Sequence, residues 1–365
     1  MNKYVISIMI ALLQDIFAFV DQIIPSPINL LFPYTFSPKD DAHNITSTTL
    51  ATFNILSYNI NNVSVHSSKH RGAIIHAILS SNSDIILLQE TNVEWEKAIN
   101  AAELQYRYTH YHHQGPKDRA AGGLAVLSHY PVTNVTILDF SRDIDGSVFP
   151  AMTFDVNIPI PIQDKNSLSP SSHEATIHIA NVHLRPPVNL DGSAQLDTAR
   201  KTEPIRVKEA KELIKQSTNQ RDTANFTKQP PLDIIAGDFN ENDNRGGLNY
   251  LQSLGYKDAL HHVPRRKETH TWPFGNMLTL RKRLDHILWN TTSPLTSTID
   301  DIKLKCLLCG VLTGYEEGAS DHQPVIARFA IVSTLNNTLS RRNSCTSRNT
   351  VSFAIKRSIS NNSVS

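Results

Sequence analysis

Apolar residues follow two different periods along the chain, and the two kinds of segment alternate from residue 50 onward. Alternating or continuous apolar runs, typical of β-strands, occupy residues 50–60, 84–88, 122–128, 151–156, 176–184, 233–240, 284–289 and 325–331. Apolar residues spaced by three and four, typical of amphipathic helices, occupy residues 71–79, 94–104, 203–216 and 248–254. Residues 157–174, rich in Pro and Ser, are predicted to form a long hairpin loop. The pattern predicts an α/β protein.

The two ends of the chain differ from this central region. Lys3 and the apolar run 5–13 match a secretory signal, but Asp15 interrupts the run, and its spacing also suits an amphipathic helix lying on a membrane. We therefore predict four parts: a hydrophobic segment that is a signal peptide or anchor (1–31), a linker (32–47), one folded domain (48–332) and a disordered basic tail (333–365). A secreted or membrane-associated location is slightly favoured over an intracellular one.

Composition narrows the classes of partner. The chain has 365 residues, 40% of them hydrophobic, which is ample for a core, and we expect a monomer. Its net charge of +1 provides no bulk attraction for nucleic acid, so a polyanionic substrate would have to be held locally. Cys306 and Cys309 form a lone Cys-x-x-Cys, which is too little for a zinc site and predicts either two buried thiols or one local disulfide.

A carboxylate and an amide follow the apolar strand at residues 233–240. Alternate side chains of a strand share a face, so Asp238 and Asn240 are predicted to project together while Phe239 packs into the core. Such a pair can deprotonate a water and hold a phosphate oxygen. The alternative is a turn that closes the strand.

Polar residues also stand at the ends of other predicted strands, namely Asn59, Glu90, His183 with Arg185, Asp285, and Asp321 with His322. A glutamate emerging from a buried strand needs a cation unless it reaches solvent. His183 and Arg185 are two apart, so we predict that they present an imidazole and a guanidinium to one anion. The Asp321-His322 pair indicates a metal ligand and a hydrogen-bond donor, or else a turn before the last strand.

Seven short motifs occur in the order found in one known family. They are Leu56-Ser57-Tyr58-Asn59, Leu87-Leu88-Gln89-Glu90, Gly122-Gly123-Leu124-Ala125-Val126, Asn181-Val182-His183-Leu184, Ala236-Gly237-Asp238-Phe239-Asn240, Arg283-Leu284-Asp285-His286-Ile287 and Ser320-Asp321-His322. With them the sequence resembles the endonuclease/exonuclease/phosphatase superfamily, whose fold is that of pancreatic deoxyribonuclease I. The resemblance covers roughly residues 48–332 and identifies this region as the catalytic domain.

The resemblance implies a four-layer α/β sandwich of two packed, mostly antiparallel sheets flanked by helices. It also implies Mg²⁺ or Mn²⁺, held by Glu90 with help from Asn59 and Asp321. Asp238 would be the general base for the attacking water, and Asn240 would orient a phosphate oxygen. The remaining implied roles are hydrogen bonds to the non-bridging oxygens, donated by His183 and by His322 paired with Asp285.

The implied reaction is hydrolysis of a phosphodiester or phosphomonoester, with a nuclease-like substrate favoured. Family members act on DNA, RNA, phosphoinositides, sphingomyelin and phosphotyrosyl-DNA links, and loops decide among them. Basic residues at 261–267 and 281–283 support a nuclease, whereas the apolar residues 1–31 support a lipid or inositol phosphate phosphodiesterase tethered at a membrane. A non-catalytic scaffold is the third reading, although such a protein would be expected to have lost Glu90, Asp238 or His322.

One segment departs from the family pattern. Many members carry an arginine or another polar group in the strand before the His183 strand, where this chain has Ser147-Val148-Phe149-Pro150. Arg185, our own addition to the site, is the first candidate to contact a substrate phosphate in its place, and Arg281 and Lys282 are the others.

Overall fold

The computed structural model describes residues 49–114, 120–161, 172–188, 198–220, 230–243, 245–262, 270–272, 282–291, 294–299, 301–312 and 318–333. The hydrophobic segment 1–31, the linker 32–47 and nearly all of the basic tail 333–365 lie outside the described residues. Among the described helices, none is long and apolar enough to cross a membrane.

Two β-sheets form the centre of the fold. The first has the order β12 (Ile302–Val311), β13 (Val325–Ser333), β1 (Thr49–Asn59), β2 (Ile85–Thr91), β4 (Gly123–Ser128) and β3 (Tyr108–His112). The second has the order β5 (Val132–Leu138), β6 (Ala151–Pro161), β7 (Ser172–His183), β8 (Ile234–Asp238), β10 (Asp285–Asn290) and β9 (Tyr256–Asp258), with β11 (Thr296–Ser297) beside the start of β7. Each sheet contains one parallel pair, β1 with β2 and β7 with β8, and the other pairs are antiparallel.

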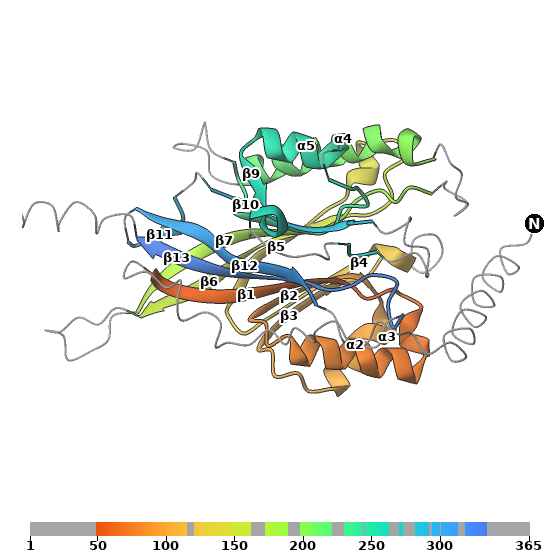
Figure 1. Ribbon diagram of the computed structural model, residues 1–365, viewed down its shortest axis with the longest axis horizontal. Helices are drawn as coiled ribbons and strands as arrows, with labels where there is room; N and C mark the ends of the chain where they lie inside the picture. Colours follow the sequence, from red (N-terminus) through yellow and green to blue (C-terminus); the bar gives the residue numbers. More distant parts are fainter. Residues whose placement is uncertain are drawn as a thin grey trace, which may run out of the picture.

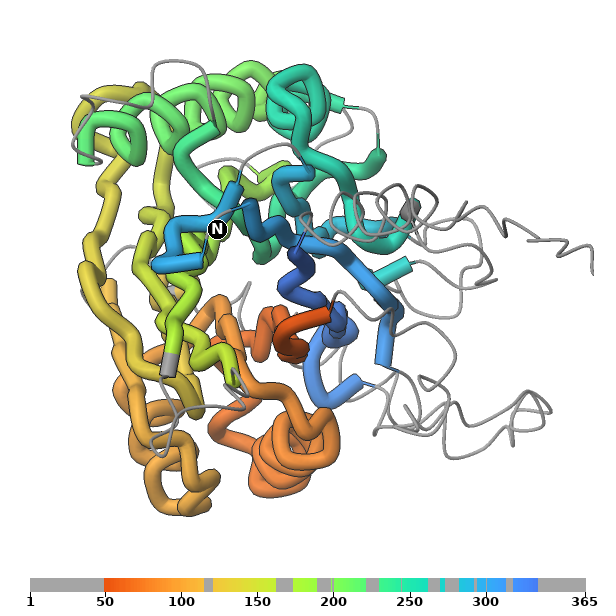
Figure 2. Tube along the Cα trace, turned by 90° about the vertical axis from the view of Figure 1, so that its left-hand side faces the viewer, coloured from red at the N-terminus to blue at the C-terminus, as the bar shows by residue number. Residues whose placement is uncertain are grey.

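Helices cover the outer face of each sheet, so the fold has four layers (Figure 1). The first sheet is covered by α2 (Ser68–Ser80) and α3 (Val93–Ala101), and the second by α4 (Thr198–Gln220) and α5 (Gly246–Ser253). Figure 2 shows the two helix pairs at opposite sides of the strands. The short elements are η2 (Ser64–His66), η3 (Ala120–Gly122), η4 (Phe140–Arg142) and α6 (Ala259–His262). The expected four-layer sandwich of the deoxyribonuclease I type is confirmed.

Strand alternation explains how one sequence fills three apolar layers. In β1, Ile55 belongs to the core between the sheets while its neighbour Leu56 packs under α2 and α3. In β8, Ile234 and Ala236 face the inter-sheet core while Ile235 packs under α4 and α5. Because side chains alternate with a period of two, every second residue at the ends of these strands must also face the gap between the sheets.

The predicted strands and helices are present, with two differences. The hairpin loop is shorter than predicted, since β6 continues to Pro161 and β7 begins at Ser172. Pro159 and Pro161 lie in the last part of β6 without ending the strand. The strands β3, β5, β9, β11 and β12 were not predicted, because their runs are short or carry His, Lys and Asn among the apolar residues. Cys306 and Cys309 are buried thiols that do not form a disulfide with each other, which confirms one of the two alternatives for them.

Candidate active site

Polar residues meet where the parallel pairs of the two sheets end. Asn59, His183 and Asp238 continue the series of side chains that face the inter-sheet core, and each is the last residue of its strand. Asp285 opens β10, which runs antiparallel to β8 and pairs Asp285 with Asp238. The period of the strands therefore brings residues from four distant parts of the chain to one edge.

Asp238 lies at the centre of this cluster. Its Oδ2 atom is 3.1 Å from the Nδ2 of Asn59 and 3.5 Å from the Nε2 atoms of both His183 and His322. Its Oδ1 accepts a hydrogen bond of 2.8 Å from the backbone N–H of Asn240. Burial and the nearby charge of Asp285 raise the pKa of Asp238 above its ordinary value, against the lowering effect of the two histidines. A raised pKa makes this carboxylate a better base than an exposed one.

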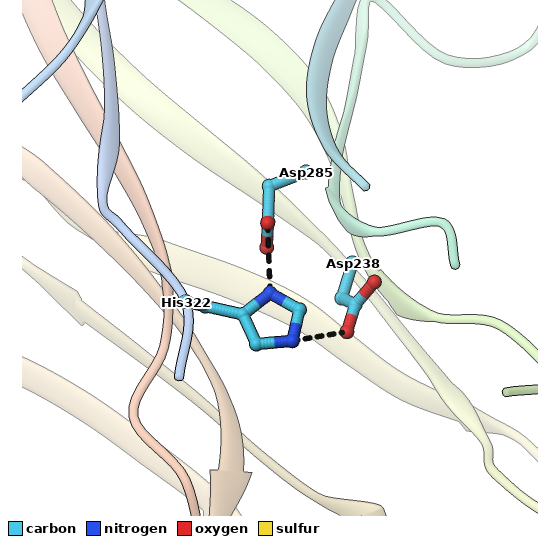
Figure 3. Close-up of side chains that lie close together, drawn as sticks. All are labelled: Asp238, Asp285 and His322. Atoms are coloured by element: carbon cyan, nitrogen blue, oxygen red, sulfur yellow. Dashed lines mark hydrogen bonds and ion pairs between the residues drawn. The ribbon is translucent and has the colours of Figure 1, made fainter. Parts of the chain in front are cut away.

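His322 lies between two carboxylates (Figure 3). Its Nδ1 is 2.8 Å from Oδ2 of Asp285, so the contact that the family resemblance implies is present, and its Nε2 points toward Asp238. Burial alone would lower the pKa of His322, but the charges of Asp285 and Asp238 outweigh it and raise the pKa well above 6.5. The ring is therefore held as an imidazolium that can donate from Nε2.

Two hydroxyl groups fix the segments that carry this pair. The Oγ1 of Thr271 accepts hydrogen bonds from the backbone N–H groups of Leu284 and Asp285, and its carbonyl accepts one from Gln323. The Oγ of Ser320 donates to the carbonyl of Asn59. Thr271 is thus bonded to Asp285 and to Gln323, the residue after His322. The sequence did not predict this role, because Thr271 lies neither in an apolar periodic segment nor at the end of a predicted strand.

Glu90 reaches the site through a β-bulge. Gln89 pairs with Leu124 and Thr91 with Gly123, which leaves Glu90 as the extra residue, and its φ is +59°. Without the bulge, alternation would turn Glu90 away from the inter-sheet side that Gln89 faces. Its Oε1 accepts from Nδ2 of Asn59 at 3.1 Å and its Oε2 from the N–H of Asn62 at 3.2 Å.

The carboxylate of Glu90 is influenced by a second negative charge, that of Asp321. Burial and the neighbouring negative charge of Asp321 raise the pKa of Glu90 to about 7, although Asn59, Asn62 and His322 act to lower it. Asp321 is exposed and accepts a hydrogen bond of 2.8 Å from Nδ2 of Asn61. Two carboxylates with oxygen donors only suit a magnesium ion that keeps several waters, so Glu90 and Asp321 fit the expected metal.

Asn59 joins two carboxylates of the site, and its expected role as a metal ligand stays a prediction. Its Nδ2 is directed to Glu90 and Asp238, and its Oδ1 accepts the N–H of Asn61 at 3.0 Å. The side chain therefore bridges two carboxylates as a donor and has its oxygen engaged elsewhere. The reason is that the turn after β1 brings the Asn61 N–H to the amide oxygen, which sequence spacing does not reveal.

Two groups of acidic and histidine side chains in the described residues have ligand atoms within 4.8 Å of one another: Asp238 with Asp285 and His322, and Asp243 with Asp258 and His261. In the first, the imidazolium of His322 already lies between the carboxylates. In the second, the guanidinium of Arg283 contacts both carboxylates. In each group the carboxylates are therefore already paired with a positively charged side chain of the protein.

His183 carries its proton on Nδ1, because that atom is 3.0 Å from the carbonyl oxygen of Ala121, which can only accept. Burial lowers the pKa of His183, with Asp238 acting in the opposite direction. In the neutral ring Nε2 is an acceptor, so the predicted donor role would require a second proton. Asn240 is near the site, but β8 ends at Asp238 and Asn240 has a φ of +52°, so a turn rather than strand alternation places it. Its Nδ2 donates to the carbonyl of Leu184.

Arg185 does not join His183 as predicted. β7 ends at His183, and the guanidinium of Arg185 is buried against the carbonyls of Pro186 and Val188. Of the other basic candidates, Arg281 lies outside the described residues, and Lys282 places its Nζ over the ring of Trp272 at 5.9 Å. Arg283 is buried and bonded to acidic partners, so it does not form the basic surface expected of residues 281–283.

A buried amide pair lies directly beneath the site. Nε2 of Gln89 in the first sheet donates to Oδ1 of Asn181 in the second at 2.7 Å, and Nδ2 of Asn181 donates to carbonyls of the first sheet. Both residues belong to the motifs named in the sequence analysis. Gln89 immediately precedes Glu90, and Asn181 lies two positions before His183. The signal for them was their polarity at positions where the strand period demands an apolar side chain.

Comparisons with known proteins agree with this architecture. The model of the Endonuclease/Exonuclease/phosphatase family matches residues 51–322. The search of curated proteins found no significant match.

Several solved structures share the fold at low sequence identity. A functionally unknown conserved protein from Enterococcus faecalis V583 has a TM-score of 0.53 and 14% identity, over 76% of this chain and 99% of that chain. D. rerio TDP2 complexed with single strand DNA product has a TM-score of 0.50 and 12% identity, over 76% and 99%. The human Nocturnin catalytic domain with bound sulfate anion has a TM-score of 0.50 and 14% identity, over 77% and 94%.

Proposed function

Because the chain belongs to the Endonuclease/Exonuclease/phosphatase family, we propose that it is a divalent-metal-dependent hydrolase that cleaves a phosphate ester with a water activated by Asp238. The observation that carries this proposal is the convergence on one oxygen. Oδ2 of Asp238 lies within 3.5 Å of side chains from three other segments, and all of them belong to motifs of the family. Several partners on one buried oxygen fix the direction of the carboxylate, which a base needs in order to meet the attacking water.

In the proposed reaction Asp238 takes a proton from the attacking water. Asn59 holds the Oδ2 atom in place, and the N–H of Asn240 holds the Oδ1 atom. The neutral His183 adds an acceptor at Nε2 for the second proton of the same water. Positioning of this kind, with stabilisation of the charge that develops on phosphorus-bound oxygens, supplies most of the rate in phosphoryl transfer.

His322 supplies the positive charge on the protein side. Its Nε2 is the second donor of an imidazolium whose other nitrogen is bonded to Asp285, and it lies 3.5 Å from Oδ2 of Asp238. In the proposed complex it donates to a non-bridging phosphate oxygen, where a negative charge accumulates as the water attacks. Asp285 keeps the ring in one orientation and keeps it charged.

Glu90 and Asp321 would hold the metal ion, with Mg²⁺ or Mn²⁺ proposed from the hard oxygen donors. When bound, the ion would neutralise phosphate charge. Asn59 contributes indirectly, because its amide keeps Glu90 and Asp238 at a fixed separation.

A nuclease-like substrate is the preferred class. Two proteins of the same fold were solved with a single-stranded DNA product and with a sulfate anion, ligands that share tetrahedral oxyanions. The alternative, a lipid or inositol phosphate phosphodiesterase tethered at a membrane, depends on the apolar residues 1–31. A non-catalytic scaffold is disfavoured because Glu90, Asp238 and His322 are all present.

The test incubates the full chain and Mg²⁺ with plasmid DNA, RNA, a 5′-tyrosyl oligonucleotide, sphingomyelin and inositol phosphates. We expect hydrolysis of at least one nucleic-acid substrate, reduced about a hundredfold or more by Asp238→Asn. Cleavage of the lipid alone would select the alternative class. A folded protein that hydrolyses none of the panel would favour the scaffold.

A further inference from the structure

The imidazole of His183 is enclosed on three sides. Its Nδ1 is fixed by the carbonyl of Ala121, its Nε2 faces Asp238, and one face of its ring is stacked on Phe149. The ring centroids of Phe149 and His183 are 4.3 Å apart and the planes differ by 27°. The aromatic ring of Phe149 therefore covers one face of the histidine.

The segment that carries Phe149 has no regular secondary structure and is held by side chains. The Oγ of Ser147 donates to Oε1 of Glu209 at 2.5 Å. The carbonyl of Val148 accepts from Nε2 of Gln114 at 3.1 Å. Because residues 143–150 form no helix or strand, these contacts decide where the phenyl ring lies.

Glu209 holds the strand of His183 as well. It lies on α4 with its side chain fully buried, and its Oε2 accepts the backbone N–H of Arg185 at 2.9 Å. One carboxylate therefore binds Ser147, two residues before Phe149, and Arg185, two residues after His183. The two oxygens of a single group fix the relative position of the two stacked rings.

A buried carboxylate in this place is costly. Burial raises the pKa of Glu209 to about 7, even though Ser147, the N–H of Arg185 and the charge of Arg206 act to lower it. Arg206 in turn is paired with Glu241 at 2.7 Å and donates to the carbonyl of Arg185 at 2.9 Å. The helix α4 is thus bonded to Arg185, which follows His183, and to Glu241, which follows Asp238. Of these contacts, those of Glu209 connect the strand of His183 with the segment of Phe149.

We propose that Glu209 and Phe149 are positioning residues for His183, which hold its imidazole against the Asp238 carboxylate through the stacked ring and the bonds to Ser147 and Arg185. Neither residue touches the reacting atoms, so neither is catalytic. The inference rests on the proposed hydrolase function, since it assigns how one side chain of that site is oriented.

The kinetic test compares Phe149→Leu and Glu209→Gln in the wild-type and His183→Ala backgrounds, using full-length protein. Leucine keeps part of the apolar volume but not the flat face, and glutamine cannot accept both bonds of Glu209. Each change is expected to lower kcat about tenfold with little change in KM, and to cost nothing further once His183 is absent. The same fractional loss in both backgrounds would show that the two residues act independently of His183 and would overturn the proposal.

Glu212→Gln is the matched control, because Glu212 is on the same helix, and its carboxylate accepts from Lys215 and Gln216 rather than from the site. It is expected to leave kcat unchanged. Ser147→Ala removes one of the two Glu209 bonds and tests the same path with a smaller disturbance, should Glu209→Gln prevent folding.

A measurement that needs no turnover follows the His183 ring by NMR, with its signals assigned by their loss in His183→Ala. We expect these signals to move in Phe149→Leu and Ser147→Ala and to stay in place in Glu212→Gln. Unchanged signals in the first two would overturn the proposal. If the variants show these shifts while the wild-type chain hydrolyses no substrate, the proposed function fails and the positioning role does not, so the two failures are distinguishable.

Discussion

The Nδ1 atom of His322 lies 2.8 Å from Oδ2 of Asp285, although His322 precedes the last strand of the first sheet and Asp285 opens a strand of the second. This contact therefore spans the gap between the sheets. The contact forms only when the two sheets are packed together. Thr271 stabilises it through hydrogen bonds with the backbone N–H groups of Asp285 and Gln323.

Asp285→Asn is expected to reduce kcat about a hundredfold or more while KM changes little, because an amide neither stabilises the imidazolium of His322 nor fixes its proton on Nδ1. Steady-state kinetics on whichever substrate the panel identifies measures this. The exposed Asp145, changed to Asn in the same way, is the control. Retention of activity within a few fold would contradict the assigned role of the pair.

Glu90→Gln separates metal binding from fold stability. Burial and Asp321 raise the pKa of Glu90 to about 7, so its protonated carboxyl group contributes stability that is fully present below pH 4.5 and is lost as the pH rises through about 7. The variant is therefore expected to be at least as stable as the wild type in EDTA at neutral pH.

With Mg²⁺ added, the wild type is expected to be more stable than Glu90→Gln. An ion that binds only the folded state stabilises it by about 1.4 kcal/mol for each tenfold excess of its concentration over Kd. Thermal unfolding should show a rise in Tm with Mg²⁺ for the wild type and for Glu94→Gln, whose side chain is exposed on α3, and none for Glu90→Gln. An equal rise in all three would place the ion elsewhere.

Protonation of Asp258 is expected to account for part of the stability that the protein loses at acid pH. Although burial acts to raise it, the pKa of Asp258 is lowered to about 2 because His286 and Arg283 contact the carboxylate at 2.6 and 3.0 Å. A lowered pKa means that stability is present above the ordinary value of 3.8 and is lost as the pH falls toward 2. The difference amounts to about 2 kcal/mol.

Urea unfolding of the wild type and Asp258→Asn at a series of pH values tests this. The wild type should lose free energy of unfolding steeply between pH values of about 4 and 2, and the variant should show a shallower slope there. Parallel curves would mean that Asp258 is not ionised against those partners in the folded protein.

Gly237→Ala should destabilise the strand that ends in Asp238. A Cβ on Gly237 would lie 1.9 Å from the carbonyl oxygen of Val182 in the neighbouring strand, and its φ is +146°. Because the obstacle is backbone, we expect a loss of at least about 2 kcal/mol in the free energy of unfolding. Gly72→Ala, in α2 with open space around it, should instead stabilise by about 0.5 to 1 kcal/mol. Similar effects of both changes in chemical denaturation would contradict the close approach.

The ends of the apolar runs were sufficient to place three residues of the site. Asn59, His183 and Asp238 were predicted at or near strand ends, and each is the last residue of its strand. Counting in twos failed where the backbone leaves the strand. Arg185 lies beyond the end of β7, and Asn240 lies in a turn with positive φ.

Contacts that depend on bulges and long-range packing could not be predicted. Glu90 is directed by an extra residue in β2, and which atom of Asn59 faces it depends on the Asn61 N–H. Thr271 and Glu209 act through bonds to residues more than ten positions away in sequence, and no local period records such a partner. The roles of Thr271 and Glu209 could be identified only from the structure, which shows how α4 and the segment before β10 pack.

The pairing of β1 with β13 has a consequence for biosynthesis. The first strand of the domain, which ends in Asn59, has its neighbour at the far end of the chain, and His322 immediately precedes that neighbour. A growing polypeptide on the ribosome therefore has no complete reaction centre until its closing strand has been made and inserted. A product terminated before Ser320 would lack His322 and β13, and under the proposed function it would not hydrolyse a phosphate ester.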